Sequence, residues 1–263
     1  MFGVPRWRSR IPAQIFATLV AIIFFFPLTA MVGVSLQGEG FATNYWAVLT
    51  RTPFFHFGLN SLIIAAGGIV LVYLCTMLAS YVLAKFEFPL KRILYYSILA
   101  GLVLPSTALV VPLFIAVQRL NLFNNYLAVI VPLTALSIPF MVLLTRNYIE
   151  GIPNEILEAA RIDGCGTFKS LVFIIMPLAR PITVVLVVLV FLGGWNEFLL
   201  PLLFFQSEDM QVVTQIPLYF ASQYASDTPK IFAALVMISV PVVVLYLALQ
   251  RLFESGLTSG AVK

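Results

Sequence analysis

Six long apolar stretches constrain this chain more than any other feature of its sequence. Each is nearly free of charged residues and reaches the roughly 20 residues that a helix needs to cross about 30 Å of hydrocarbon. The stretches are 11–36, 59–84, 93–117, 126–145, 181–205 and 231–250. A transmembrane β-barrel would instead contain short segments in which apolar and polar residues alternate, and no such period is present. The sequence therefore predicts an all-α, polytopic membrane protein with six transmembrane helices.

Composition and segment length indicate one membrane domain. Of the 263 residues, 61% are hydrophobic and 10% are charged, which is far outside the range of soluble globular domains. The first apolar stretch is much longer than the core of a secretory signal, about 7 to 15 residues, so it is expected to remain as a helix. No linker is long enough to separate domains. Residues 1–263 are therefore predicted to form a single transmembrane domain.

The lysines and arginines predict the orientation of the spans. Of the 15 basic residues, all but Arg51, Arg119 and Lys230 fall on one side of the predicted helices. Basic residues accumulate on the cytoplasmic side of a membrane. Both termini and the loop 146–180 are therefore predicted to be cytoplasmic. The same distribution accounts for the net charge of +4 without a nucleic acid partner.

This cytoplasmic loop has the signals of a short helix. Pro153 stands where the first turn of a helix tolerates proline, and Gly164 stands where a helix ends. Helical spacing places Asn154, Glu158 and Arg161 on one face. The apolar or small residues of another face are Ile152, Ile156, Ala159 and Ala160. The pattern alone fits either a surface that another protein approaches closely or a plain amphipathic helix at the membrane interface.

The spacing of residues within the loop resembles the EAA loop of inner-membrane permeases in binding-protein-dependent ATP-binding-cassette (ABC) importers. That pattern is EAA, three residues, glycine, nine residues, then I-x-L-P. Met176 stands where the pattern has leucine. The matching residues are Glu158, Ala159, Ala160, Gly164, Ile174 and Pro177.

Further segments resemble the smaller permease subunit of the maltose-type carbohydrate importers, at 60–62, 79–84, 194–198 and 256–263. The resemblance covers nearly the whole chain and implies a type I importer permease domain in a bacterial or archaeal cytoplasmic (inner) membrane. It implies a heterodimer with a second related permease, two ATP-binding subunits, an external solute-binding protein, contact with membrane lipid and a sugar substrate. A di- or oligosaccharide is the expected solute, and a non-sugar solute such as a glycerol-phosphate compound is the alternative.

The resemblance also implies a role for the loop in coupling. The helix from Pro153 to Asp163 would dock in a cleft of an ATP-binding subunit and move as a rigid body when the ATP-binding subunits close. The chain has no G-x-x-x-x-G-K-[ST] loop, so it is not expected to be an enzyme or to bind a cofactor or a metal. ATP and Mg²⁺ would be used by the partner subunits. The predicted coupling residues are Glu158, Ala159, Ala160, Asp163, Gly164 and Gly166.

Two other regions carry candidate sites. Glu197 is the only charged residue within the six predicted spans, and such residues usually face a bundle interior or a water-filled cavity. Trp195, Asn196 and Glu197 are therefore candidates for the translocation path, with a structural contact between helices as the alternative. The external loop 206–229 resembles the position where the smaller subunit of this family meets the binding protein, which implies a docking surface there, with a plain solvated loop as the alternative. Its named docking residues are Glu208, Asp209, Gln211 and Gln215.

The main alternative from another class is an ion-coupled secondary transporter. Such a protein usually has several acidic or histidine residues within its spans and often an internal repeat. This sequence has one acid in its spans and no evident repeat. His56, the only histidine, is expected to be structural. A membrane scaffold without transport activity would explain the spans but not the spacing of the EAA residues.

Overall fold

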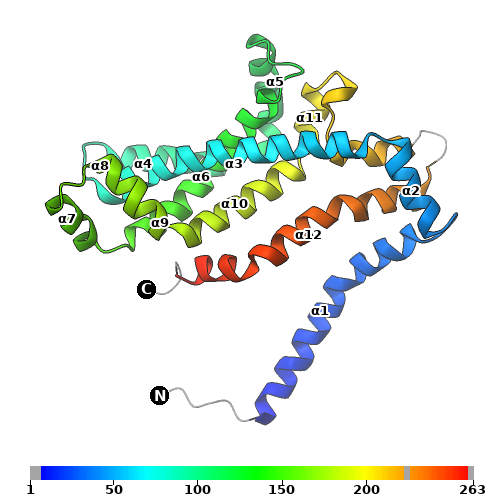
Figure 1. Cartoon of the computed structure of the whole chain (residues 1–263), viewed down its shortest axis with the longest axis horizontal. Helices are drawn as coiled ribbons and strands as arrows, with labels where there is room; N and C mark the ends of the chain where they lie inside the picture. Colours follow the sequence, from blue (N-terminus) through cyan, green and yellow to red (C-terminus); the bar gives the residue numbers. More distant parts are fainter. Residues whose placement is uncertain (1–6, 222–225, 260–263) are drawn as a thin grey trace. The chain divides into compact units, whose positions relative to one another are not determined.

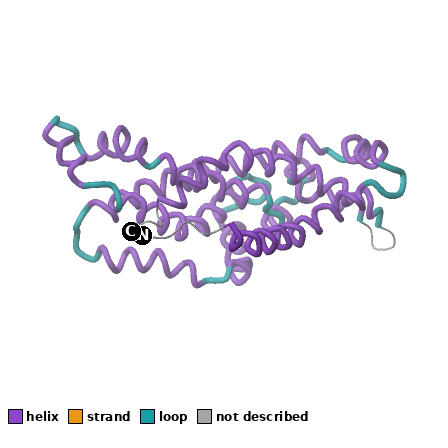
Figure 2. The backbone as a smooth tube through the Cα atoms, turned by 90° about the horizontal axis from the view of Figure 1, so that it is seen from below, coloured by secondary structure: helices purple, strands orange, loops and turns teal. Residues whose placement is uncertain are grey.

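The computed structural model describes residues 7–221 and 226–259, and it describes side chains in 11–221 and 226–250. The described residues form helices joined by short turns, with one isolated antiparallel bridge between Ala221 and Ser226 (Figures 1 and 2). The predicted all-α class is confirmed.

The helices are labelled in Figure 1 in chain order, and η denotes short 3₁₀ or π helices. They are α1 (Trp7–Ser35), α2 (Phe41–Arg51), α3 (Phe54–Lys85), α4 (Lys91–Ala100), η1 (Gly101–Val103), η2 (Ser106–Leu109), α5 (Val110–Arg119), α6 (Leu127–Glu150), α7 (Asn154–Ile162), α8 (Thr167–Ser170), η3 (Leu171–Ile175), α9 (Met176–Leu178), α10 (Arg180–Trp195), α11 (Leu199–Phe204), η4 (Glu208–Met210), η5 (Val213–Phe220) and α12 (Thr228–Ser259).

Four helices in the described part of the chain are long and apolar enough to cross a membrane. They are α1 from Ile11, α3, α6 and α12 as far as Gln250. The number rises to six if each of two bent helix pairs counts as one span. The structure is therefore polytopic, as predicted, but two of the expected spans are not straight.

The expected span 93–117 is bent by 94° between the helical segments Lys91–Val103 and Ser106–Arg119. The break falls at Leu104, whose backbone is extended at φ −79° and ψ 119°. Pro105 follows, and a proline disfavours helical geometry in the residue before it.

The expected span 181–205 is also interrupted. Helix α10 ends at Trp195, and α11 begins only at Leu199. On its other side α10 meets the segment Thr167–Leu178 at a bend of 78°. The apolar character of this stretch is continuous, but its helix is not.

Contacts between Cα atoms divide the chain into two compact units. One contains residues 1–54 and 216–239, and the other contains 55–215 and 240–263. The sequence has no linker at these boundaries, and α12 runs through both. Each unit is described by itself below.

The larger unit is built around α3, α6 and α10, whose buried side chains pack together (Figure 1). Glycine lets these helices approach closely: a Cβ atom added to Gly194 of α10 would lie 2.8 Å from the Cα atom of Ala65 on α3. One added to Gly67 of α3 would lie 2.7 Å from the side chain of Ile130 on α6. Small residues at such crossings are the usual basis of helix packing within a membrane. Helix α3 therefore lies against both neighbours, and α7 projects beyond their ends.

Candidate functional site

The predicted short helix of the EAA segment is present as α7, from Asn154 to Ile162. Pro153 precedes it as the N-cap residue, so the proline lies one position outside the helix. Glu155 is in the first turn and Arg161 in the last turn. This arrangement matches the positive N-terminal and negative C-terminal ends of the helix dipole.

The end of α7 is a Schellman motif built on Gly164. The Cys165 N–H donates to the Ala160 carbonyl at 2.8 Å, and the Gly164 N–H donates to the Arg161 carbonyl at 3.0 Å. Gly164 has φ +78°, a left-handed conformation that favours glycine. Gly166, by contrast, has φ −72° and needs no glycine for its backbone.

One face of α7 belongs to the core of the larger unit. Leu157 and Ala160 are 6% and 7% exposed, and Leu157 lies in a cluster that joins α7 to α3, α6, η3 and α10. The fully buried members of this cluster include Met77, Ile149, Ile175 and Ala179. Ala160, one of the predicted coupling residues, therefore packs within its own chain.

The opposite face of α7 is exposed. It carries Glu155, Glu158 and Ala159, together with Ile162, which is 87% exposed. Asp163 and Gly164 are also exposed. The sequence patterns did not single out Ile162, although its position four residues after Glu158 and three after Ala159 places it on their face of the helix.

The last turn of α3 holds both ends of the EAA segment. The Lys85 ammonium donates to the Ile152 carbonyl, just before α7, and to Asn154 Oδ1 at 2.9 Å. The Tyr81 hydroxyl donates to the Thr167 carbonyl, after α7, at 3.4 Å. These contacts join residues more than 60 positions apart in the sequence.

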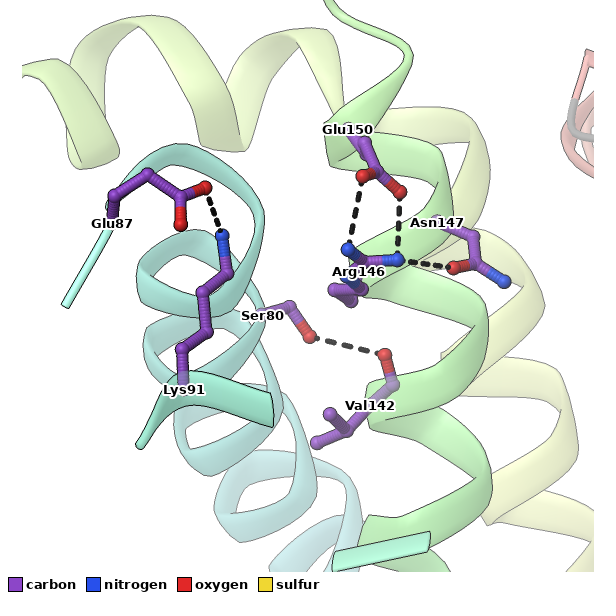
Figure 3. A network of polar contacts seen from close by, with 7 residues as sticks. All are labelled: Ser80, Glu87, Lys91, Val142, Arg146, Asn147 and Glu150. Atoms are coloured by element: carbon purple, nitrogen blue, oxygen red, sulfur yellow. Dashed lines mark hydrogen bonds and ion pairs between the residues drawn. The ribbon is translucent and has the colours of Figure 1, made fainter. Parts of the chain in front are cut away.

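Polar contacts also fix the neighbouring end of α6 (Figure 3). Arg146 forms an ion pair with Glu150 at 2.7 Å and donates to Asn147 at 3.2 Å. The Ser80 hydroxyl on α3 points to the Val142 carbonyl on α6, at 3.5 Å. The ends of α3 and α6 are therefore joined by a hydrogen bond beneath the EAA segment.

The candidate path residues lie at the interruption after α10. Trp195 is 6% exposed and stacks on Phe191 with ring centroids 5.6 Å apart. Asn196 is exposed and donates to the Leu192 carbonyl at 3.0 Å. Glu197 is half-buried and accepts a hydrogen bond from the Leu200 N–H at 3.0 Å. The Glu197 carboxylate thus caps the first turn of α11, and the role of Glu197 in the translocation path stays a prediction.

The candidate docking loop is held by its backbone at the opposite end of α3. Asn60 is 1% exposed and donates to the carbonyls of Asp209 and Gln211 at 2.8 and 2.7 Å. His56 Nε2 contacts the Asp209 carbonyl at 2.7 Å, so this nitrogen carries the proton. The next residue, Ser61, accepts from the Val213 N–H at 3.0 Å. His56 therefore has a structural contact, in line with its expected role.

The named docking residues do not share one environment. Glu208 and Asp209 are exposed, and Gln211 is half-buried. Gln215 is fully buried, and its side-chain oxygen accepts from the Val212 N–H at 3.0 Å. Gln215 therefore belongs to the interior and not to the surface of the loop. Residues 222–225 of the predicted loop lie outside the described residues.

Two residues that the sequence patterns missed support the same loop. Tyr126 donates to Asn60 Oδ1 at 2.7 Å, so every hydrogen-bonding group of the Asn60 amide has a partner. Asn124 accepts from the backbone N–H groups of Gln206 and Ser207 at 2.7 and 2.9 Å. In the sequence, the adjacent polar residues Asn60 and Ser61 stand within an apolar stretch. They were the available indication that polar contacts hold this loop.

The smaller unit contains a buried lysine, Lys230, that is 4% exposed. Its ammonium forms ion pairs with Asp227 and, at 3.2 Å, with Glu39. The hydrogen bond from Lys230 lowers the pKa of the Asp227 carboxyl below its usual value, against an opposing effect of burial. The pair ties the turn after α1 to the start of α12 within this unit.

A set of long apolar helices with a short amphipathic helix displayed at one end is the architecture of a multi-pass membrane permease. The chain belongs to the family described as "Binding-protein-dependent transport system inner membrane component", which it matches over residues 73–259. It is therefore a multi-pass inner-membrane permease of an ABC importer and not its ATPase. The predicted family, membrane localisation and permease role are confirmed, as opposed to an ion-coupled secondary transporter.

Known permeases resemble the chain over most of its length. It is 35% identical to the diacetylchitobiose uptake system permease protein NgcG of Streptomyces coelicolor, over 82% of this chain and 72% of that protein. It is 30% identical to the melibiose/raffinose/stachyose import permease protein MelC of Bacillus subtilis, over 98% of both. A chain in the crystal structure of a bacterial ABC transporter for the acidic polysaccharide alginate has the same fold, with a TM-score of 0.79 and 20% identity over 95% of this chain and 99% of that one.

Proposed function

We propose that this chain is one of two related permease subunits in a carbohydrate importer, together with two cytoplasmic ATP-binding subunits and an external solute-binding protein. Family membership supports the binding protein, because the family is defined by dependence on one. The heterodimeric partner and the ATP-binding subunits follow from the resemblance to maltose-type permeases. ATP and Mg²⁺ would be bound by those partner subunits.

The observation that carries the proposal is the division of α7 into two faces. Leu157 and Ala160 anchor the helix in the core of its own chain. Glu158, Ala159 and Ile162 remain free on the other face. An isoleucine that is 87% exposed on a helix outside the bundle is best explained by a protein surface that covers it.

Helix α7 can transmit movement because one of its faces is anchored in the core and the other face is exposed. A partner that pulls on the exposed face also displaces Leu157 and the four elements packed around it. Closure of the ATP-binding subunits would thereby tilt the spanning helices and change the side of the membrane to which the path opens. This coupling requires that the ATP-binding subunits bind the two permease states with different affinities.

The proposed substrate class is a di- or oligosaccharide. The names of the relatives refer to diacetylchitobiose, to melibiose, raffinose and stachyose, and to arabinooligosaccharides. One relative, SmoH of Agrobacterium fabrum, is named for sulfoquinovosyl glycerol, and the chain is 31% identical to it. A glycerol-containing compound is therefore the second candidate.

The coupling surface is tested in proteoliposomes that contain the complete complex. Ile162→Ser and Glu158→Ala are expected to lower solute uptake per ATP hydrolysed by about tenfold, because they alter only the exposed face of α7. Leu120→Ser is the matched control, since Leu120 is 67% exposed in the turn after α5 and away from the EAA segment. Normal uptake and assembly in both α7 variants would refute the docking of α7.

The substrate is tested with the binding protein encoded beside this permease. Calorimetric titration with disaccharides, trisaccharides and glycerol 3-phosphate gives the ligand class directly, and uptake of the bound compound by the reconstituted complex follows. Binding of an oligosaccharide supports the proposal. Binding of glycerol 3-phosphate alone would assign the importer to the second candidate class.

A further inference from the structure

Helix α3 differs from the other candidate spans in its continuity. Of the four continuous spans in the described residues, α1, α6 and α12 contain prolines, whereas α3 has none. The two remaining candidate spans are bent by 94° and 78°. A helix without proline loses no internal hydrogen bond to that residue. Helix α3 is therefore the one continuous, proline-free candidate span that the described residues provide between the two ends of the larger unit.

The first turns of α3 hold the candidate docking loop. His56, Asn60 and Ser61 contact backbone atoms of residues 209, 211 and 213. Asn60 is buried and uses both its N–H groups and its oxygen. A displacement of this loop therefore either moves α3 or breaks these hydrogen bonds, which is costly for the buried Asn60 amide.

The last turn of α3 holds the coupling helix. Lys85 binds the Ile152 carbonyl and Asn154 at the start of α7, and Tyr81 binds Thr167 beyond its end. Tyr81 also packs edge-on against Phe86, with ring centroids 5.3 Å apart. The segment from Asn60 to Lys85 is one helix, about 37 Å long at 1.5 Å per residue.

The position of the Lys85 ammonium is unfavourable for the stability of α7 itself. A cation beside the N-terminus of a helix is opposed by the helix dipole. Its partners are nevertheless a carbonyl and an amide oxygen at that N-terminus. We explain these contacts by the need to hold the start of α7 against the end of α3, and not by stabilisation of the α7 helix itself.

We propose that α3 transmits the binding of the external solute-binding protein to the coupling helix, with Asn60 and Lys85 as positioning residues at its two ends. The inference rests on the proposed function, which places partners at both ends. It adds the route between them, because the loop at Asp209 and the start of α7 contact the same continuous helix. Helix α6, which precedes α7 directly in the sequence, contains Pro132 and Pro139 and is the competing route.

The test measures ATP hydrolysis by the reconstituted complex with and without ligand-loaded binding protein. Lys85→Met is expected to leave basal hydrolysis within about twofold and to reduce its stimulation by binding protein about tenfold. The affinity for binding protein should stay unchanged, because Lys85 lies at the other end of α3. Lys85→Arg should restore stimulation, since a guanidinium group donates to both oxygens. Lys91→Met is the control, because Lys91 forms an ion pair with the exposed Glu87, four residues earlier.

A double-mutant cycle then tests whether the two ends act through one element. Asn60→Asp removes the two N–H groups and keeps the acceptor for Tyr126. On a shared route, the double variant Asn60→Asp with Lys85→Met loses no more stimulation than the more damaged single variant, whereas independent effects multiply. Multiplying losses would overturn the inference. So would normal stimulation in Lys85→Met while Ile162→Ser is uncoupled, and that result would leave the proposed function intact. A normal Ile162→Ser would instead refute the proposed function.

Discussion

Replacing Gly164 by alanine separates backbone conformation from side-chain packing at the end of the coupling helix. A Cβ atom added at Gly164 meets no atom within 4 Å, and the same is true at Gly166. The two glycines differ in their backbone, since only Gly164 has a positive φ, +78°. Alanine at position 164 would therefore strain the backbone, whereas alanine at position 166 would not. Neither alanine would overlap with neighbouring atoms.

The left-handed backbone of Gly164 determines how much the alanine substitution should destabilise the end of α7. A residue with a Cβ atom in the left-handed conformation costs roughly 1–2 kcal/mol relative to glycine. Gly164→Ala is expected to destabilise the end of α7 by this amount. At Gly166 the backbone is already favourable, and alanine should change the local free energy by less than about 0.5 kcal/mol. The difference corresponds to about 5- to 30-fold in the equilibrium constant for local opening.

Hydrogen–deuterium exchange measures this opening directly. The N–H groups of Gly164 and Cys165 are protected by the Schellman hydrogen bonds. In Gly164→Ala their exchange should be about 5- to 30-fold faster, while Gly166→Ala exchanges as the unaltered protein does. Gly164→Asn should fall between the two, because asparagine tolerates the left-handed conformation. Equal exchange in the two alanine variants would refute the assigned role of the positive φ.

Three further changes test other parts of the structure. Leu157→Ala should cost about 2–5 kcal/mol and lower the thermal midpoint of the purified complex, whereas Leu120→Ala at an exposed site should not. Asn124→Ala removes the acceptor of two exposed backbone N–H groups, so their exchange should accelerate as expected for a loss of about 0.5–1.5 kcal/mol. The lowered pKa of Asp227 means that its ionised form stabilises the fold above its unfolded pKa of about 3.9, and that this stability is lost as pH falls through the lowered value. Asp227→Asn should therefore lower the midpoint at pH 7, and this effect should shrink as pH falls below the unfolded pKa; an effect that does not change with pH would contradict the assignment.

Local chemistry made the ends of α7 predictable from sequence. Pro153 and Gly164 restrict the backbone by their own covalent structure, so their meaning does not depend on distant residues. The buried face of α7 was less predictable. Apolar residues occur at Ile156, Leu157 and Ile162, on both sides of the helix, so their spacing alone does not select the inner face.

The breaks in the spans could not be predicted from the sequence, for a related reason. Pro105 interrupts a helix, but Pro132 and Pro139 lie inside the continuous α6. Membrane helices tolerate proline where neighbours bind the freed carbonyl groups, and the sequence does not identify those neighbours. The contacts of Asn60 with residues about 150 positions away were beyond prediction from sequence pattern for the same reason.

Helix α1 differs from the other spans in which substitutions its sequence can accept during evolution. No residue in its most apolar window is buried against the rest of the chain. Exchanges among leucine, isoleucine, valine and phenylalanine on this helix should therefore be nearly neutral for the fold of the chain, whereas one charge near its centre would oppose insertion by about 2.5–3.5 kcal/mol. For the fold of this chain, the sequence of α1 would then be constrained in its hydrophobicity and not in particular side chains.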